Sequence, residues 1–249
     1  MPEKLHLVPR DAENSIGHRS NRFLRALPTE SYDRLAAELE TVDLRVKVVL
    51  WEPDAPIRSV YFPHTCVISN IVPLRDDISV EASTVGREGF LGVPILLGET
   101  STSTRAIAQI AGMASRLPSS VFRRAVAEDG VLRELSLRYA QALLEQTAQS
   151  VACIGRHELS ERCARWLLMT QDRVDGNEFR LTQEFLAIML GVRRSTVTIA
   201  AGMLQRAGLI KYQYGRVTIL DRSGLEEASC ECYEVVRQKY EKFLGEATG

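Results

Sequence analysis

The sequence predicts an α+β protein in which a β-rich amino-terminal half, one long helix and a winged helix–turn–helix follow one another along the chain. Three observations carry this prediction. Short apolar runs of strand character occupy the first half, and the pattern turns helical from Ser119 onwards. The stretch 131–155 contains no proline. Segment 181–220 has the pattern of two helices followed by a hairpin.

The β-rich half begins with two short helices in residues 20–40, separated at Pro28. Apolar residues then alternate with other residues over 42–50, which predicts a half-buried strand. Further β-like runs occupy 58–63, 65–73, 78–86 and 105–117, with Pro, Gly or Asp-Asp between them. Several short strands at this spacing favour a small sandwich or barrel over a parallel sheet.

Composition limits the setting in which the protein works. The 249 residues carry a formal net charge of −1, so any surface for a polyanion must be local. The chain has no apolar run of about 18 residues, and its start lacks the apolar core of a signal peptide. Five scattered cysteines argue against a disulfide framework and for a reducing compartment. We therefore expect a cytoplasmic protein with no membrane partner.

The long helix over 131–155 carries a 3.5-residue repeat, which is the spacing of a coiled-coil seam. The members of this stripe are Leu132, Leu135, Tyr139, Ala142, Gln146, Gln149 and Cys153. Polar residues interrupt the stripe, and a twofold axis would suit the segment that follows. We therefore expect the stripe to pair with a second copy of the chain. The alternative is a helix packed on its own domain. Gly155 is expected to break the helix and to act as a hinge.

Segment 181–220, LTQEFLAIMLGVRRSTVTIAAGMLQRAGLIKYQYGRVTIL, holds five basic residues and one acidic residue. Thr182 is expected to cap the first helix and Gly191 to end it. The second helix then begins near Arg193, and in such motifs its start enters the major groove of DNA. The hairpin has Tyr214-Gly215 at its tip and resembles a wing that contacts phosphates. The alternative is an ordinary helical corner with no nucleic-acid partner.

These features predict double-stranded DNA as the partner, because arginine bonds guanine and Ser or Thr contacts bases or phosphates. The expected DNA-binding residues are Thr182, Arg193, Arg194, Ser195, Thr196, Thr198, Lys211 and Arg216.

The order of the parts, and above all LTQEFLAIMLGVRRSTVTIAAGMLQRAGLI, resembles the Crp/Fnr family of bacterial transcription regulators over residues 20–220. The resemblance implies an amino-terminal cyclic-nucleotide-binding-like β-barrel (a jelly roll), a dimerisation helix and a winged helix–turn–helix. It also implies a homodimer on palindromic DNA and RNA polymerase as a further partner. Arg194 matches the family's base-reading arginine. Ser195 replaces a base-reading Glu of many relatives, and Ile199 replaces a second Arg of some.

The expected boundaries are an amino-terminal segment (1–19), the barrel with its leading helices (20–125), the dimerisation helix (126–155), the DNA-binding domain (156–222) and a carboxy-terminal helix (223–249).

The effector cassette of the family is matched less closely by GFLGVPILLGETSTSTRAIAQIAG, residues 89–112. Gly92 matches a family glycine, but Val93 replaces the ribose-binding Glu. Thr102 and Ser103 stand where the family has the Arg-Ser pair that holds the cyclic phosphate, and Arg105 is displaced from it. A buried phosphate needs a cation or several amides, so Arg87 and Arg105 are the candidates to replace the arginine of the missing Arg-Ser pair. We expect no response to cyclic AMP, and either another ligand in the same pocket or none.

No metal or other cofactor is expected. The amino-terminal cysteine cluster of the family's iron–sulfur members is missing, since Cys66 is the first cysteine. His64 and Cys66 are interpreted as packing residues rather than haem ligands. Cys230 and Cys232 are expected two apart on the carboxy-terminal helix, where their side chains would point about 200° away from each other. Ser223 and Glu226 form a capping box for that helix, which we expect to brace the fold or to contact a dimer partner.

The leading hypothesis is a homodimeric, sequence-specific DNA-binding regulator. The alternative is a signalling or scaffold module that keeps the barrel and uses the helical half for protein contacts. No catalytic triad, phosphate-binding glycine loop or paired metal-ligand motif is recognisable, so the protein is not expected to be an enzyme.

Overall fold

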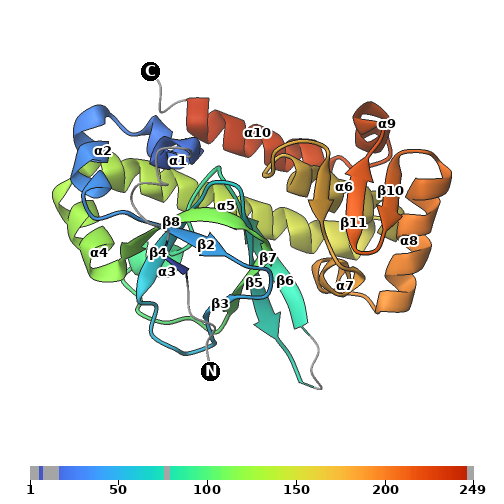
Figure 1. Ribbon diagram of the computed structural model, residues 1–249, viewed down its shortest axis with the longest axis horizontal. Coiled ribbons are helices and arrows are strands. Elements are labelled where there is room, and N and C mark those ends of the chain that lie inside the picture. Colours follow the sequence, from blue (N-terminus) through green and yellow to red (C-terminus); the bar gives the residue numbers. More distant parts are fainter. Residues whose placement is uncertain (1–5, 8–16, 76–78, 246–249) are drawn as a thin grey trace.

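The computed structural model describes residues 6–7, 17–75 and 79–245. A β domain occupies one end of the molecule and the winged helix–turn–helix the other (Figure 1). The long helix α5 runs between them, and the carboxy-terminal helix α10 packs along it. The predicted order of parts is therefore confirmed. Of the expected amino-terminal segment 1–19, all but residues 6–7 and 17–19 lies outside the described residues.

Two four-stranded antiparallel sheets form the β domain. The first has the order β1-β2-β8-β4 and the second the order β3-β7-β5-β6. The sheets are jelly-roll-like and do not close into a barrel. Their strands are β1 (His6–Leu7), β2 (Glu40–Leu44), β3 (Val49–Trp51), β4 (Ser59–Pro63), β5 (Val67–Pro73), β6 (Ser79–Val85), β7 (Arg105–Ile110) and β8 (Gly112–Pro118).

Two of the predicted strands are each divided between the sheets. The run 42–50 breaks at Lys47, whose φ of 71° is left-handed, so that β2 belongs to the first sheet and β3 to the second. The run 105–117 breaks before Gly112 in the same way, giving β7 and β8. Apolar alternation continues across both breaks, because each half-strand still has one face on the shared core. Alternation alone therefore does not reveal where the chain changes sheet.

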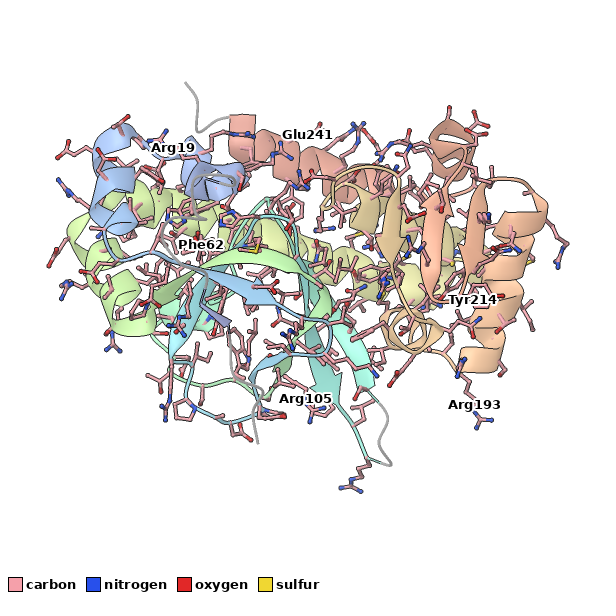
Figure 2. The ribbon with its side chains drawn as sticks, viewed as in Figure 1. Arg19, Phe62, Arg105, Arg193, Tyr214 and Glu241 are labelled. Atoms are coloured by element: carbon pink, nitrogen blue, oxygen red, sulfur yellow. The ribbon has the colours of Figure 1, made fainter. Side chains whose placement is uncertain are left out.

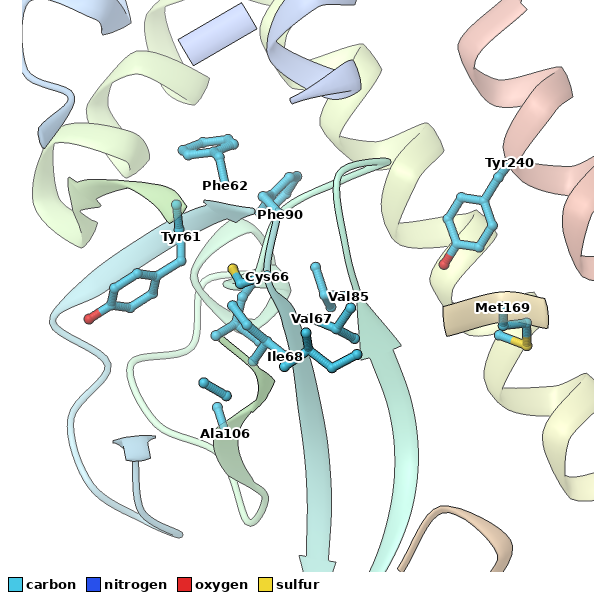
Figure 3. Close-up of a cluster of buried hydrophobic side chains, with 14 of the residues drawn as sticks. Tyr61, Phe62, Cys66, Val67, Ile68, Val85, Phe90, Ala106, Met169 and Tyr240 are labelled. Carbon is cyan, nitrogen blue, oxygen red and sulfur yellow. The ribbon is translucent and has the colours of Figure 1, made fainter. Parts of the chain in front are cut away.

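Aromatic rings fill the space between the β domain and α5. Phe90 lies 4.8 Å from Tyr139, 5.0 Å from Phe23 and 5.1 Å from Phe122, measured between ring centroids. Figure 3 shows Phe62 and Phe90 above the aliphatic side chains of β5. A Cβ on Gly89 would lie 1.8 Å from the Tyr139 ring, so only glycine lets this ring pack against the backbone.

The helices cover the β domain and build the other end of the molecule. They are η2 (His18–Ser20), α1 (Arg22–Ala26), α2 (Thr29–Ala36), α3 (Val93–Leu96), α4 (Ser119–Glu128), α5 (Gly130–Arg156), α6 (Leu159–Gln171), α7 (Gln183–Leu190), α8 (Arg194–Arg206), α9 (Arg222–Glu227) and α10 (Cys232–Gly245). No single described helix is long and apolar enough to cross a membrane, and only α7 with α8, a bent pair, passes that test together.

The helix α5 is where it was predicted, but the stripe expected at the dimer seam faces inward. Leu132, Leu135, Tyr139, Ala142, Gln146 and Cys153 are all buried within one chain. They are covered by α4, α10 and β6. The interpretation of this stripe as an intermolecular seam is therefore wrong, and the alternative of packing within the chain holds for it.

A second apolar stripe of α5 is exposed. Leu137, Leu144 and Val151 follow each other at seven-residue spacing and are 48%, 60% and 69% exposed, with Ile154 beside them at 45%. The helix also continues through Gly155 to Arg156, and His157 is its C-cap. The break before α6 therefore lies two residues later than predicted.

The carboxy-terminal tail braces the molecule, as expected, but it consists of two helices. Asp221, not Ser223, caps α9 by accepting from the Gly224 amide. Phe243 of α10 packs 5.9 Å from Tyr139 and 6.4 Å from Phe23. This contact ties the end of the chain to its first described helices (Figure 1).

The expected placement of the two tail cysteines is also wrong. Cys230 lies in the turn before α10 and Cys232 is the first residue of that helix. Both thiols are buried. The argument from a 200° separation on one helix therefore does not apply to this pair.

Candidate nucleic-acid interface

The helices α7 and α8 form a helix–turn–helix, and local chemistry sets both ends of the turn. The Thr182 hydroxyl accepts from the Phe185 amide at 3.2 Å and caps α7. Gly191 ends α7 with a left-handed φ of 64°. The two helices then bend by 97° relative to each other, within the range of helix–turn–helix motifs. The expected cap at Thr182 and the expected helix end at Gly191 are confirmed.

A shared core holds this angle. Leu186, Leu190, Val197 and Ala200 are fully buried between α7 and α8, while Val192 is half-buried. The Arg162 guanidinium on α6 donates to the Leu190 carbonyl near the end of α7. Because α6 supports the motif from behind, the outer face of α8 remains free for a ligand.

The start of α8 presents polar side chains to solvent. Arg193, Arg194, Ser195 and Thr198 are exposed and Thr196 is half-buried. Figure 2 shows Arg193, the N-cap of α8, extending away from the protein. Arg194 donates through Nε to Gln183 Oε1 at 3.1 Å, a bond between exposed side chains that a nucleic acid can replace. These five residues are brought together as predicted.

The wing is a three-stranded sheet, β10-β11-β9, formed by β9 (Glu178–Arg180), β10 (Ile210–Gln213) and β11 (Arg216–Ile219). At its tip Tyr214 and Gly215 have φ values of 51° and 71°. Positive φ at both central residues is typical of a two-residue hairpin turn. The tip lies next to the start of α7, where the Leu181 amide donates to the Gly215 carbonyl at 2.9 Å.

The basic residues of the wing do not lie beside the start of α8. Lys211 and Arg216 share one face of the sheet, and this face lines a cavity of about 590 Å³ together with Val46 and Gln109 of the β domain. Arg216 forms an ion pair with Glu178, which lowers the pKa of that carboxyl. Arg180 lies opposite Arg216 in the sheet and was missed by the sequence analysis, although its position just before the Thr182 cap is a usable signal.

The helix–turn–helix rests against the second sheet of the β domain. Lys47 forms an ion pair with Glu184 at 2.9 Å, and Gln109 donates to the Met189 sulfur at 2.9 Å. Arg193 and Arg194 line a cavity of about 730 Å³ between α7 and β7. Arg193 and Arg194 therefore line a different cavity from Lys211 and Arg216.

Solved structures of bacterial regulators share this fold. A CRP-family transcriptional regulator from Thermus thermophilus is 21% identical, with coverage of 75% of this chain and 95% of its own and a TM-score of 0.61. FixK2 from Bradyrhizobium japonicum is 17% identical, with coverage of 77% and 98% and a TM-score of 0.64. CLP of Xanthomonas campestris, described as a c-di-GMP responsive global regulator, is 16% identical, with coverage of 77% and 99% and a TM-score of 0.59. None of the curated proteins compared matches the chain.

At these identities the likeness establishes the fold, and a second finding establishes the domain. The family model of the Crp-like helix-turn-helix domain matches residues 161–228. This chain carries a Crp-like helix-turn-helix domain. The resemblance to the Crp/Fnr family is thereby confirmed, and the Crp-like domain on this fold supports a DNA-binding transcription regulator.

The six residues predicted to form an effector pocket are Arg87, Gly92, Val93, Thr102, Ser103 and Arg105. The two arginines among them line separate cavities. Arg87 pairs with Asp175 at 2.8 Å and lines a cavity of about 300 Å³ beside α6 and α10. Arg105 pairs with Glu52 at 2.7 Å and lines the separate cavity beside α7 (Figure 2). The two arginines therefore do not share one cavity, and each is paired with a carboxylate.

Local structure accounts for the remaining effector residues. Gly92 has a φ of 141°, and a Cβ there would lie 2.8 Å from Val60. Val93 begins α3. Thr102 and Ser103 lie in the loop before β7, where the Thr102 carbonyl accepts from the Asp54 amide at 2.7 Å. A shared effector pocket for these four residues stays a prediction.

Proposed function

We propose that the chain regulates transcription as a homodimer that binds a palindromic site in double-stranded DNA. The observation that carries the proposal is the cluster of exposed Arg, Ser and Thr side chains at the start of α8, held by a Crp-like domain. Such a helix start reads base edges in the major groove. Arg194 would bond guanine bidentately, and its neighbours would contact bases and phosphates.

The exposed stripe of α5 supports the homodimer. Leu137, Leu144 and Val151 recur every seven residues, which is the spacing of a two-stranded seam. The described part of the chain leaves them uncovered, so a second copy of α5 is the natural occupant. A twofold axis along α5 would place two recognition helices about 34 Å apart, which matches half-sites one DNA turn apart.

The proposal includes DNA binding without cyclic AMP. Val93 supplies no carboxylate for a ribose, and the nearby arginines are engaged by Glu52 and Asp175. A cyclic phosphate in the β domain would therefore lack a cation to compensate its charge.

The test begins with selection of binding sites from random double-stranded DNA by the purified full chain, without added effector and at near-physiological salt. We expect enrichment of an inverted repeat, with affinity that falls as salt rises because phosphate contacts release counterions. Arg194→Ala should weaken binding to the selected site by about 1–3 kcal/mol and weaken binding to random DNA less.

Arg206→Ala is the matched control, since Arg206 is exposed at the opposite end of the same helix. Arg206→Ala should reduce the affinity for the selected site less than Arg194→Ala does. Equal losses on selected and random DNA would refute base reading by Arg194. A folded protein that enriches no sequence, with or without cell extract, would refute the function itself.

A further inference from the structure

Four side chains with metal-ligating atoms meet where α5 ends and the carboxy-terminal tail begins. They are Cys153 and His157 at the end of α5, Cys230 in the turn before α10, and Cys232 at the start of α10. The three sulfur atoms and one imidazole nitrogen all lie within 4.8 Å of one another. The Crp-like domain match covers residues 161–228, so all four lie outside it.

The spacing of these atoms suits one tetrahedral ion. Cys153 Sγ lies 3.5 Å from Cys230 Sγ, and Cys232 Sγ lies 3.5 Å from His157 Nδ1. Zinc–sulfur bonds of about 2.3 Å and zinc–nitrogen bonds of about 2.1 Å at tetrahedral angles separate the ligand atoms by roughly 3.5–3.8 Å. Cys153 lies on the last turn of α5, where its carbonyl accepts from the amide of the C-cap His157 at 3.0 Å, so the two residues are one turn apart at the helix end.

Polar groups outside the ligand set hold two of the ligands in place. His157 turns Nδ1 toward Cys232 and places Nε2 3.1 Å from a Glu231 carboxylate oxygen. A histidine that binds a metal through one nitrogen and a carboxylate through the other is the usual outer-sphere arrangement. Gln149 donates to Cys232 Sγ at 3.0 Å. Hydrogen bonds of this kind orient a thiolate ligand.

The local charge also fits. Three thiolates, a neutral imidazole and one divalent cation carry a net charge of −1, and a buried charge needs a partner. Arg165 is buried and interacts electrostatically with Cys153, as does Arg162 on the same helix. The Nε of Arg165 has no hydrogen-bond partner among the described residues. A guanidinium in this position would balance the anionic complex.

We propose that Cys153, His157, Cys230 and Cys232 bind one Zn²⁺ ion in a closed tetrahedral site that fastens the carboxy-terminal tail to α5. Four protein ligands leave no open position, so the ion is structural rather than catalytic. Thiolate and imidazole ligands select a borderline-soft cation over Mg²⁺ or Ca²⁺. A four-iron cluster would hold each cysteine on a different iron, which requires wider spacing than 4.8 Å.

The site has a consequence for the Crp-like domain that rests on the proposed function. Only Glu158, the N-cap of α6, separates His157 from that helix. A bound ion would fix this junction and thereby the position of the helix–turn–helix relative to α5. Metal binding is measured without DNA, so a chain that binds no metal and a chain that binds no DNA are distinguishable.

The experiment uses the full chain, purified under reducing conditions without chelator. Elemental analysis should find one zinc per chain. After removal of the metal, Co²⁺ should give the intense visible bands of a tetrahedral complex and sulfur-to-cobalt charge transfer in the near ultraviolet. Zn²⁺ should then displace it stoichiometrically. Cys232→Ser should weaken Co²⁺ binding by at least about tenfold, as loss of a ligand or its supporting shell does.

Two further variants separate loss of the site from loss of the fold. Cys66→Ala removes a buried thiol of the β domain and should leave metal binding unchanged. His157→Cys supplies a fourth sulfur and should retain a tetrahedral spectrum with stronger charge transfer. A folded wild-type chain that gives no thiolate charge transfer with Co²⁺ would overturn the proposal. A Cys153–Cys230 disulfide whose reduction restores no metal binding would overturn it as well.

Discussion

At the residue scale, Arg173 joins three parts of the molecule through one guanidinium group. Its Nε donates to Glu88 Oε1 at 2.9 Å, its Nη1 to the Met169 carbonyl at 2.7 Å, and its Nη2 to Gln146 Oε1 at 3.1 Å. The contacts therefore tie the end of α6 to the loop after β6 and to α5. The sequence does not predict the Arg173–Glu88 pair, because 85 residues separate the two charges and no local pattern pairs them.

The Arg173–Glu88 pair yields the first prediction. Both side chains are only 6% exposed, so removal of one partner leaves a buried charge without compensation. Glu88→Gln or Arg173→Met should lower the free energy of unfolding by about 3–5 kcal/mol in urea titrations. Arg237→Met, which breaks exposed pairs on α10, should cost less than about 1 kcal/mol. Equal losses of unfolding free energy in Arg173→Met and Arg237→Met would contradict this account.

Glu81 on β6 yields a prediction about pH. Burial raises the pKa of this carboxyl to about 8, although Ser69 and the charges of Arg173 and Arg165 offset part of the effect. The folded state therefore holds the proton more tightly than the unfolded state. The contribution of Glu81 to stability is present below its unfolded pKa near 4.5 and is lost as pH rises toward 8.

Glu81→Gln should remove this loss, so that the variant gains stability relative to the wild type as pH rises through that window, by up to a few kcal/mol. The difference between the two proteins is the measurement. Burial lowers the pKa of His64 to about 4, which gives the wild type an opposite slope in part of the range. Parallel stability curves for the two proteins would show that Glu81 keeps an ordinary pKa.

At the scale of elements, the turn between α7 and α8 was predictable because its signals are local. A capping threonine, a left-handed glycine and an apolar spacing lie within a few residues of one another. The face of α5 was not predictable in the same way. Its sequence carries two apolar stripes, and which one is buried depends on α10, which lies about 90 residues away in the chain. The 3.5-residue repeat marked the stripe that packs within the chain.

The turn glycine yields a prediction for the helix–turn–helix. A Cβ at Gly191 would meet Val80 at 3.7 Å, an ordinary contact, so the cost of substitution comes from the backbone φ of 64°. Gly191→Val should destabilise the domain by about 1–3 kcal/mol, and Gly191→Asn by less, because asparagine tolerates this region. Thermal and urea unfolding would measure both.

The matched control is Gly202→Ala, inside α8. There a Cβ would meet only the flexible end of Arg206 at 3.6 Å, and alanine should stabilise the helix by up to about 1 kcal/mol. If Gly191→Val cost no more than Gly191→Asn, steric rather than conformational strain would govern the turn.

At the scale of the whole molecule, the order of domains followed from the change of hydrophobic period, and the Crp-like domain followed from its motif. The contacts between segments that are distant in the chain could not be predicted from the sequence. The sequence predicts a dimer seam for Cys153 and a helix for Cys230, yet the two residues are neighbours across 77 residues. Three cysteines and a histidine on separate segments form no sequence motif, since α5 and the tail approach each other only in the folded chain. The ion pairs of Arg87 with Asp175 and of Arg105 with Glu52 likewise join distant segments, so no local pattern predicts them.

The proposed dimer yields the last prediction. Leu144→Glu together with Val151→Glu places two charges on the exposed stripe of α5. Because each charge would face its symmetry mate across the twofold axis, the dimer should dissociate in sedimentation experiments while the fold of each chain persists.

Affinity for the selected inverted repeat should then fall steeply, because a monomer engages one half-site and loses the gain from a linked second contact. Affinity for a single half-site should remain. Leu97→Glu provides the control, since Leu97 is a comparably exposed leucine, 61% accessible, at the end of α3. A double variant that stays dimeric would move the interface away from α5, and a monomer with full affinity for the repeat would mean that each Crp-like domain reads DNA alone.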